Sequence, residues 1–373
     1  MKNKELYTIS FKKFFSFLVL LSIINMDTEA NNSPKLIILP HMAGIHFSVQ
    51  VYRTASSFGA VGDGVTDDTY ALRKAFSSGL NLDLEGKKYL INVSKPAFRY
   101  GLIPSNNTII KGSGAEIILK PNNFEFYSMI TLMNSKNVKI YNLKLTGDIK
   151  SHKGSKGEWG IGIMMLGTKN CELHHVKANE TWGDGFYVGA YGEETNVNGG
   201  IFNSSARANL RVGLSVARCK NFTVKNCNFT DTGTIKYSSP GYGVDIEPNP
   251  HDYDSIDGIK LINIKTENNL GGGILFVPLN LEYSTNPNAV YNVYIEKFIS
   301  NNDGKLWGGS SLYFVEPFNK NTYDGHVEIK GFEVINLEAG GVAFGWKRNN
   351  NSSLTVDAVN LKVNGVTQYD YHY

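Results

Sequence analysis

The sequence predicts an all-β protein: a single-stranded, right-handed parallel β-helix of about nine coils with a short N-terminal capping helix. Two repeated phrases and one helix-like segment support this prediction. The first phrase is a glycine followed by an apolar, a variable and an apolar residue. It occurs six times between residues 162 and 344, with glycines 23, 28, 30, 30 and 68 residues apart. Repeats of about 20 to 50 residues are typical of solenoids.

A second phrase alternates with the first and predicts the remaining strands of each coil. In residues 137–143, 221–227, 258–264 and 326–332, apolar residues recur at every second position. A period of two with many β-branched and aromatic residues indicates strands with one buried face. Two or three such strands, joined by glycine and asparagine turns, make one coil, and stacked coils lie about 4.8 Å apart.

The N-terminus predicts a secretory signal peptide over residues 1–30. Several lysines precede an apolar run from Phe14 to Ile24, and cleavage is expected after Ala30. The run is too short to span a bilayer. We therefore expect no membrane span and a secreted protein, extracellular or periplasmic. Residues 31–50 are irregular, and residues 51–373 form the β-helix domain, with a cap over 51–80 and coils over 81–373.

Composition restricts the partners and cofactors. The net charge of +3 is too small to suggest nucleic acid as a partner. The sequence has no CxxC, HExxH or metal-spaced histidine cluster, so neither a metal nor another cofactor is expected. It has no C-terminal coiled coil, which favours a monomer. Cys171 and Cys227 fall on inward strand positions and are expected to be buried thiols, although a Cys219–Cys227 bridge is an alternative.

The capping helix is predicted just before the first coils. Asp67 is a natural N-cap, and residues 69–77 read as a short helix with Leu72, Ala75 and Phe76 on one face. A helix there would cover the apolar core and the free strand edges that the end of a β-helix exposes.

The segment 57–69, which leads into this helix, closely resembles the opening of the pectate-lyase-like β-helix superfamily. Ile103-Pro104-Ser105 and residues 109–114 continue the resemblance, which covers roughly residues 50 to 365. The superfamily includes phage tailspikes, rhamnogalacturonase-type enzymes and uronan epimerases, so the resemblance implies the fold and a polysaccharide partner. It does not imply one reaction, because this architecture hosts hydrolases, lyases, epimerases and binding proteins. The catalytic motifs of those members are absent here, and no catalytic residue is carried over from them.

Alignment of the glycine phrases predicts an outer strip of polar side chains. From coil to coil the strip is expected to contain, in pairs two residues apart, Tyr187 and Gly189, Ser215 and Ala217, Asp245 and Glu247, and Leu275 and Val277. Arg211 lies one position earlier on the same face. The inward positions are Phe186, Val188, Leu214, Val216, Val244, Ile246, Ile274 and Phe276.

Asp245 and Glu247 are the leading catalytic candidates. Two residues apart on one strand, their Cα atoms lie about 6.5–7 Å apart. Their carboxyl groups can then reach the separation of about 6.5–9.5 Å with which inverting glycoside hydrolases hold a water. Asp184 is a possible third carboxylate. The alternative is structural: Asp245 bonds a turn and Glu247 only ends the strand.

Arg211 and Tyr187 suggest a second chemistry. Elimination or C5 epimerisation of a uronic-acid polymer needs a cation for the substrate carboxylate and a base for the C5 proton. The structural alternative for Arg211 is an ion pair with Asp184 or Glu247. A third hypothesis, from another functional class, is a non-catalytic glycan-binding or adhesive protein.

Five long loops are predicted to follow the glycine-phrase strands: residues 189–200, 231–240, 247–257, 277–290 and 315–325. They are expected to overhang one flank and to offer aromatic rings to sugars. The rings are those of Tyr191, Tyr237, Tyr253, Tyr283, Phe318 and Tyr323. Asparagines at turns are expected to stack and bond one another. They are Asn179, Asn226, Asn268 and Asn301.

Overall fold

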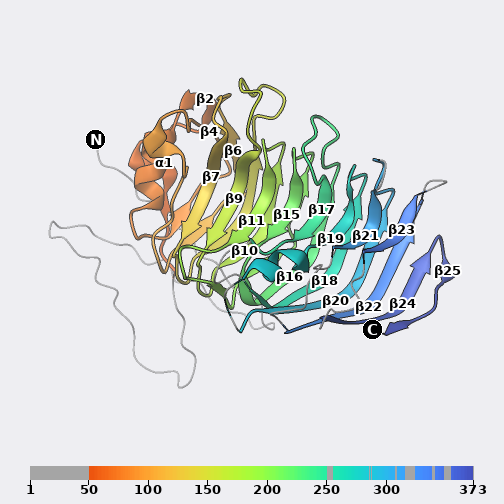
Figure 1. Cartoon of the computed structure of the whole chain (residues 1–373). Coiled ribbons are helices and arrows are strands. Elements are labelled where there is room, and N and C mark those ends of the chain that lie inside the picture. The colour runs from red at the N-terminus through yellow and green to blue at the C-terminus, as the bar shows by residue number, and fades with distance from the viewer. Residues whose placement is uncertain are drawn as a thin grey trace, which may run out of the picture. The chain divides into compact units, whose positions relative to one another are not determined.

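The strands that carry the glycine phrase form one parallel sheet of a β-helix. In the computed structural model they pair in the order β23-β21-β19-β17-β15-β11-β9-β7 (Figure 1). The structure describes residues 50–249, 255–284, 286, 288–306, 309–315, 324–337, 341–347 and 354–372. The strands of this sheet are β7 (Phe126–Met133), β9 (Trp159–Leu166), β11 (Asp184–Gly189), β15 (Val212–Val216), β17 (Tyr242–Ile246), β19 (Gly272–Phe276), β21 (Ser310–Val315) and β23 (Val342–Lys347).

The second phrase forms the other sheet, in which long strands bend around the coil. The first strands are β1 (Arg53–Thr54), β2 (Asp63–Asp67), β3 (Leu82–Asp83), β4 (Lys88–Ile91), β5 (Ile109–Lys111), β6 (Glu116–Leu119), β8 (Lys139–Thr146), β10 (Glu172–Asn179), β12 (Asn196–Val197), β13 (Gly200–Phe202) and β14 (Ser205–Arg207). The later strands are β16 (Cys219–Thr230), β18 (Ile256–Glu267), β20 (Val290–Asn301), β22 (Asp324–Ile335) and β24 (Leu354–Val363). Two short antiparallel strands, β25 (Val366–Thr367) and β26 (Tyr371–His372), pair with β24. About nine turns confirm the predicted right-handed parallel β-helix.

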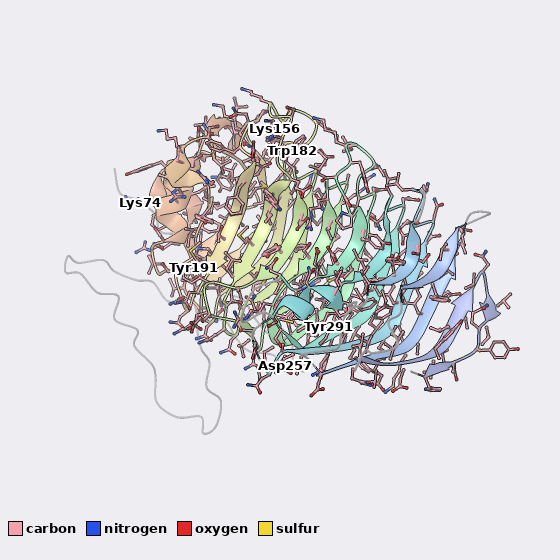
Figure 2. All side chains as sticks on the ribbon, in the orientation of Figure 1. Lys74, Lys156, Trp182, Tyr191, Asp257 and Tyr291 are labelled. Atoms are coloured by element: carbon pink, nitrogen blue, oxygen red, sulfur yellow. The ribbon has the colours of Figure 1, made fainter. Side chains whose placement is uncertain are left out.

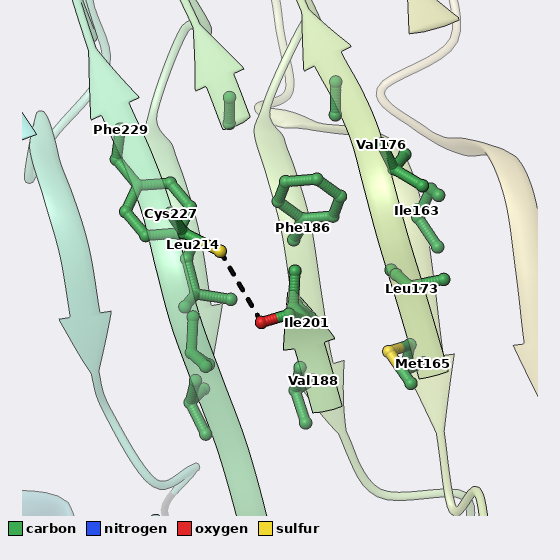
Figure 3. Close-up of a cluster of buried hydrophobic side chains, with 14 of the residues drawn as sticks. Ile163, Met165, Leu173, Val176, Phe186, Val188, Ile201, Leu214, Cys227 and Phe229 are labelled. Atoms are coloured by element: carbon green, nitrogen blue, oxygen red, sulfur yellow. Dashed lines mark hydrogen bonds between the residues drawn. The ribbon is translucent and has the colours of Figure 1, made fainter. Parts of the chain in front are cut away.

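The predicted register between coils is confirmed. Phe186 pairs with Leu214, Leu214 with Val244, and Val244 with Ile274. All these side chains are buried in one continuous core, part of which Figure 3 shows. The core lies between the two sheets and holds the coils together by apolar burial.

Close packing explains the glycine of the repeated phrase. A Cβ built on Gly185 would lie 2.4 Å from the Cβ of Ala206 in β14. A Cβ built on Gly243 would lie 2.5 Å from Cγ2 of Thr266 in β18. Any side chain at these two positions would therefore push the two sheets apart.

The capping helix α1 (Thr69–Phe76) begins where the sequence predicts and ends one residue earlier. Leu72, Ala75 and Phe76 are buried, as expected. The N-cap position is Asp68 rather than Asp67. Asp67 nevertheless accepts a 3.2 Å hydrogen bond from the Thr69 N–H, whereas the Asp68 carboxylate accepts from the N–H groups that precede β2. Three 3-10 helices, η1 (Ala55–Phe58), η2 (Pro96–Phe98) and η3 (Pro278–Tyr283), complete the elements.

Stacked asparagines hold the bends of the second sheet. Asn226 has a φ of 56°, a left-handed conformation that asparagine tolerates better than most residues. Its amide donates to Asn203 at 3.0 Å and its oxygen accepts from Asn263 at 2.8 Å. Asn268 and Asn301 bond asparagines of the next coil in the same way. The side-chain oxygen of Asn179 differs, since it is buried with no hydrogen-bond partner among the described residues.

The three cysteines are buried free thiols, which excludes the alternative Cys219–Cys227 bridge. Cys227 donates a 3.5 Å hydrogen bond to the Ile201 carbonyl (Figure 3), and burial raises the pKa of this thiol to about 12. The predicted signal peptide and most of the segment 31–50 lie outside the described residues. Within the described ranges, no helix is long and apolar enough to cross a membrane.

Replacing Asn226 by alanine should lower the free energy of unfolding by about 1–3 kcal/mol, since it removes two side-chain hydrogen bonds and leaves a left-handed residue. Asn226→Gly should recover part of the loss because glycine adopts this conformation freely. Urea unfolding measures both. Equal stability of Asn226→Ala and the exposed-site control Lys225→Ala would contradict a structural role for the stack.

Candidate active site

Arg211 is the centre of the candidate site. It immediately precedes β15, and its guanidinium lies over the outer face of the glycine-phrase sheet with its side chain 15% exposed. Nη1 donates to Asp184 Oδ2 at 3.2 Å, and Nη2 donates to Glu247 Oε2 at 3.3 Å. Asp245 Oδ2 lies 3.9 Å from Nη2, and Glu158 Oε1 lies 3.9 Å from Nε. Four carboxyl groups therefore surround one guanidinium.

The structure thus brings together four residues that the sequence predicted for the site: Asp184, Arg211, Asp245 and Glu247. Arg211 forms the ion pairs with Asp184 and Glu247 that were the structural alternative for this residue. Burial lowers the pKa of Arg211, but the charges of the four carboxyl groups outweigh burial and raise it above its ordinary value. Burial likewise raises the pKa of Asp184, while Arg211 opposes that shift. The guanidinium stays cationic and neutralises part of the acidic cluster.

Asp245 is wholly buried beneath Arg211. Its side chain is 0% exposed, and neither carboxyl oxygen accepts a hydrogen bond from a described residue. Burial, and next the charge of Glu247, raise the pKa of Asp245 well above its ordinary value, and Arg211 only partly opposes them. A protonated Asp245 can donate a hydrogen bond to Glu247, which gives the buried group the partner that its ionised form lacks. Asp245 therefore keeps its proton at pH values where an ordinary aspartate has lost it.

Glu247 is the accessible member of this pair, with its side chain 33% exposed. One carboxyl oxygen accepts from Arg211, and the other accepts from Asn280 Nδ2 of η3 at 3.3 Å. Both carboxyl groups approach Nη2 of Arg211, that of Asp245 at 3.9 Å and that of Glu247 at 3.3 Å. The predicted separation of about 6.5–9.5 Å between these two carboxyl groups stays a prediction.

A cleft of about 330 Å³ opens beside these groups. Its polar end is formed by Arg211, Glu247 and Tyr187, whose hydroxyl accepts from Asn249 Nδ2 at 3.2 Å. Its other end is an aromatic and apolar wall in which Trp159 is 48% exposed. The full lining is Tyr100, Phe126, Trp159, Ile161, Met164, Leu166, Tyr187, Arg211, Ser215, Ala217, Glu247 and Asn249.

Beyond β17 the outer strip changes character. On the next coil, Leu275 and Val277 occupy the positions that correspond to Asp245 and Glu247. Both are buried in a second apolar cluster with Tyr242. Leu279 of η3 packs against that cluster. The predicted strip therefore divides into an aromatic cleft, a charged centre and a covered apolar part.

The two predicted loop tyrosines whose side chains the structure describes do not form the aromatic wall of the cleft. Tyr191 follows β11 and Tyr237 precedes β17; both are exposed, and neither lines the cleft. Figure 2 shows Tyr191 and Trp182 at opposite ends of β11. Tyr253 lies outside the described residues, and Tyr283 ends η3 without a described side chain. Phe318 and Tyr323 also lie outside the described residues.

Loop 231–240 was expected on the same flank as the other loops, and this is wrong. It joins β16 to β17 and so precedes the glycine-phrase strand, at the edge where Arg211 lies. Ser238 of this loop donates a hydrogen bond to Glu158, and Lys236 Nζ lies 4.8 Å from the centre of the Trp182 ring. The loop therefore braces Glu158 beside the guanidinium.

Sequence reasoning missed Glu158, Trp159, Asn249 and Asn280. Glu158 directly precedes β9, which carries the first glycine phrase, and Trp159 is the first residue of β9, so extending the alignment by two positions beyond that of Arg211 would have found both. Asn280 gave no signal, because η3 belongs to no repeat. Among the described residues, no group of histidine, cysteine or acidic side chains is arranged to hold a metal ion.

Protonation of Asp245 should appear in the pH dependence of stability. Because folding raises the pKa of Asp245, uptake of its proton contributes to the free energy of unfolding. This contribution is fully present below the pKa of the unfolded state, and it is lost as the pH rises through the pKa of the folded state. Asp245→Asn keeps a neutral group, so its stability relative to the wild type should increase between about pH 4 and pH 7. Urea unfolding at several pH values measures this. A difference that stays constant with pH, as expected for the exposed control Asp324→Asn, would contradict a protonated Asp245.

Comparison with known proteins supports the fold. No family model matches the chain. The uncharacterized protein YclG of Bacillus subtilis is 26% identical over 239 residues, which cover 58% of this chain and 41% of YclG. The chain thus spans less than half the length of this curated relative.

Two solved structures share the architecture at low sequence identity. The surface adhesin PfbA of Streptococcus pneumoniae superposes with a TM-score of 0.58 and 13% identity, over 84% of this chain and 79% of PfbA. The pre-mature gene product 12 of bacteriophage phi29 superposes with a TM-score of 0.57 and 17% identity, over 76% of this chain and 40% of that protein. The chain therefore shares the parallel β-helix fold of these two structures.

Proposed function

We propose that the chain is a secreted glycoside hydrolase that binds a polysaccharide in the cleft and cleaves it beside Glu247. The observation that carries the proposal is that one cleft joins an exposed aromatic wall to an accessible carboxylate whose neighbour, Asp245, is wholly buried and has a raised pKa. Export rests on the signal-like segment of residues 1–30.

The wall suits the apolar faces of sugar rings. Trp159, Tyr100 and Phe126 offer flat rings, and Tyr and Trp also carry polar edges. Ser215 and Asn249, at the polar end, can bond sugar hydroxyls. The lining extends over the five strands from β7 to β17, so four intercoil steps of about 4.8 Å give it a length of roughly 19 Å. A short stretch of an extended glycan fits this length.

Glu247 and Glu158 can divide the chemistry of hydrolysis. They contact different nitrogens of Arg211, and each side chain is 33% exposed. Glu247, supplied with a proton by Asp245, protonates the glycosidic oxygen as the bond to the anomeric carbon breaks. Glu158 takes a proton from the attacking water, whose oxygen bonds to that carbon. Asp245, left ionised, is stabilised by Arg211.

Elimination or epimerisation of a uronic-acid polymer is less well supported. Four carboxyl groups already surround the one guanidinium before any substrate binds. Arg211 is thus already neutralised, and the cluster repels a substrate carboxylate. The charge favours a neutral sugar at this position.

Glycan binding without catalysis is the second candidate. PfbA, which is a surface adhesin, has the same fold, and the aromatic wall serves binding equally well. Binding and hydrolysis differ in whether any product is released.

Glu247→Gln should lower turnover about 10²- to 10⁴-fold while glycan binding persists, because the amide cannot transfer the proton. Asp245→Asn and Glu158→Gln should also lower turnover, and Asp324→Asn should not. New reducing ends and unsaturated-product absorbance are measured on a panel of neutral, amino-sugar and uronate polysaccharides. Absorbance together with new reducing ends would favour elimination by Arg211 and Tyr187, and binding without product would favour the adhesive alternative.

Trp159→Ala should weaken binding of the recognised glycan roughly tenfold or more, because stacking on an exposed indole contributes on the order of 1–3 kcal/mol. Tyr191→Ala, at an exposed ring outside the cleft lining, should change the affinity little. Isothermal titration with the Glu247→Gln protein as background measures both. A larger loss of affinity in Tyr191→Ala than in Trp159→Ala would instead support glycan binding by the loop tyrosines that the sequence suggested.

A further inference from the structure

We propose that the site acts on the ends of glycan chains and releases short units, rather than cleaving bonds in the chain interior. This inference rests on the proposed hydrolysis and names its mode. It depends on where Glu247 lies along the cleft.

The cleft extends in only one direction from Glu247. Its lining residues come from Tyr100 and from the coils of β7, β9, β11, β15 and β17. No described residue of β19 or β21 lines it. Glu247 follows β17, so it lies at the last coil of the cleft, with the aromatic wall on the earlier coils.

The 3-10 helix η3 closes the other side of Glu247. Leu279 of η3 packs on Leu275 and Val277, the residues that would continue the floor of the cleft on the next coil. Asn280, the next residue of η3, donates directly to Glu247 at 3.3 Å. The helix therefore contacts both the covered strip and the proposed acid, and it forms an end wall.

The wall has a consequence for the substrate. Cleavage inside a chain needs sugar residues on both sides of the acid, and therefore a groove that continues past it. Here roughly 19 Å of cleft lies on one side, and an apolar cluster under η3 lies on the other. A chain end can enter this arrangement, whereas the middle of a long chain meets η3. Leu279 and Asn280 are thus specificity-determining residues, and Asn280 also positions the Glu247 carboxylate.

The test uses the full-length chain and the polysaccharide from the panel that yields new reducing ends. Size-exclusion chromatography and viscosity follow the early reaction. We expect a narrow population of short products while the polymer keeps nearly its full length and viscosity. An early fall in viscosity with a broad ladder of products would overturn the end-acting mode and leave hydrolysis standing. Absence of product from every polymer would instead count against the proposed hydrolysis.

Variants of η3 separate the wall from the acid. Leu279→Ala should broaden the distribution of product sizes, because a smaller side chain lets the glycan extend past η3. The substitution removes no hydrogen bond to Glu247. Asn280→Ala should lower kcat while KM stays nearly unchanged, because Glu247 loses one of the two hydrogen-bond donors that position its carboxylate. Unchanged product sizes in Leu279→Ala and in the double variant Leu279→Ala/Asn280→Ala, with the fold intact by circular dichroism, would overturn the assignment of η3 as the wall. The exposed control Tyr70→Ala, on the capping helix, should change neither measurement.

Discussion

The in-register stacking of coils is the constraint on which the rest of the structure depends. Parallel pairing places Tyr187, Ser215 and Asp245 side by side although about 30 residues separate each from the next. The glycine of the repeated phrase permits this stacking, since a Cβ on Gly185 or Gly243 would collide with the other sheet. The apolar core and the asparagine stacks then hold one register, because a slip of one residue would turn inward side chains outward. A site built across several strands is possible only where such a register is fixed.

Arg211 makes an acidic cluster compatible with this scaffold. Removing carboxylates from water is costly, and the fold offsets that cost with one nearly buried guanidinium and with a proton on Asp245. The same arrangement creates two unlike carboxyl groups from two residues on one strand. Asp245 is buried and its pKa is raised, whereas Glu247 reaches the cleft and has a donor for each oxygen. Such a separation of environments is how proteins obtain an acid and a base from similar side chains.

The segments that do not belong to the repeat determine which parts of the outer strip are open and which are covered. Loop 231–240 braces Glu158 through Ser238, and η3 covers Leu275 and Val277 and reaches Glu247. The strands alone would present one uniform strip along the solenoid. The segments between them convert part of it into a cleft with one aromatic wall and one closed end. This division of labour, with a rigid repeat as scaffold and irregular segments as modifiers, places variable chemistry on an unchanged core.

The sequence by itself determined the fold, the inward and outward positions of the glycine-phrase strands, and the proximity of Asp184, Arg211, Asp245 and Glu247. These follow from a repeat whose period fixes both pairing and side-chain direction. Only the tertiary structure decided that Asp245 is buried with a raised pKa, that Trp159 lines the cleft and Glu158 lies beside Arg211, and that Asn280 bonds Glu247. The physical reason is that burial and pKa depend on what covers a strand. The residues that cover these strands come from loops and from η3, whose sequences do not repeat. Alignment of the repeats therefore cannot predict which strand residues they contact.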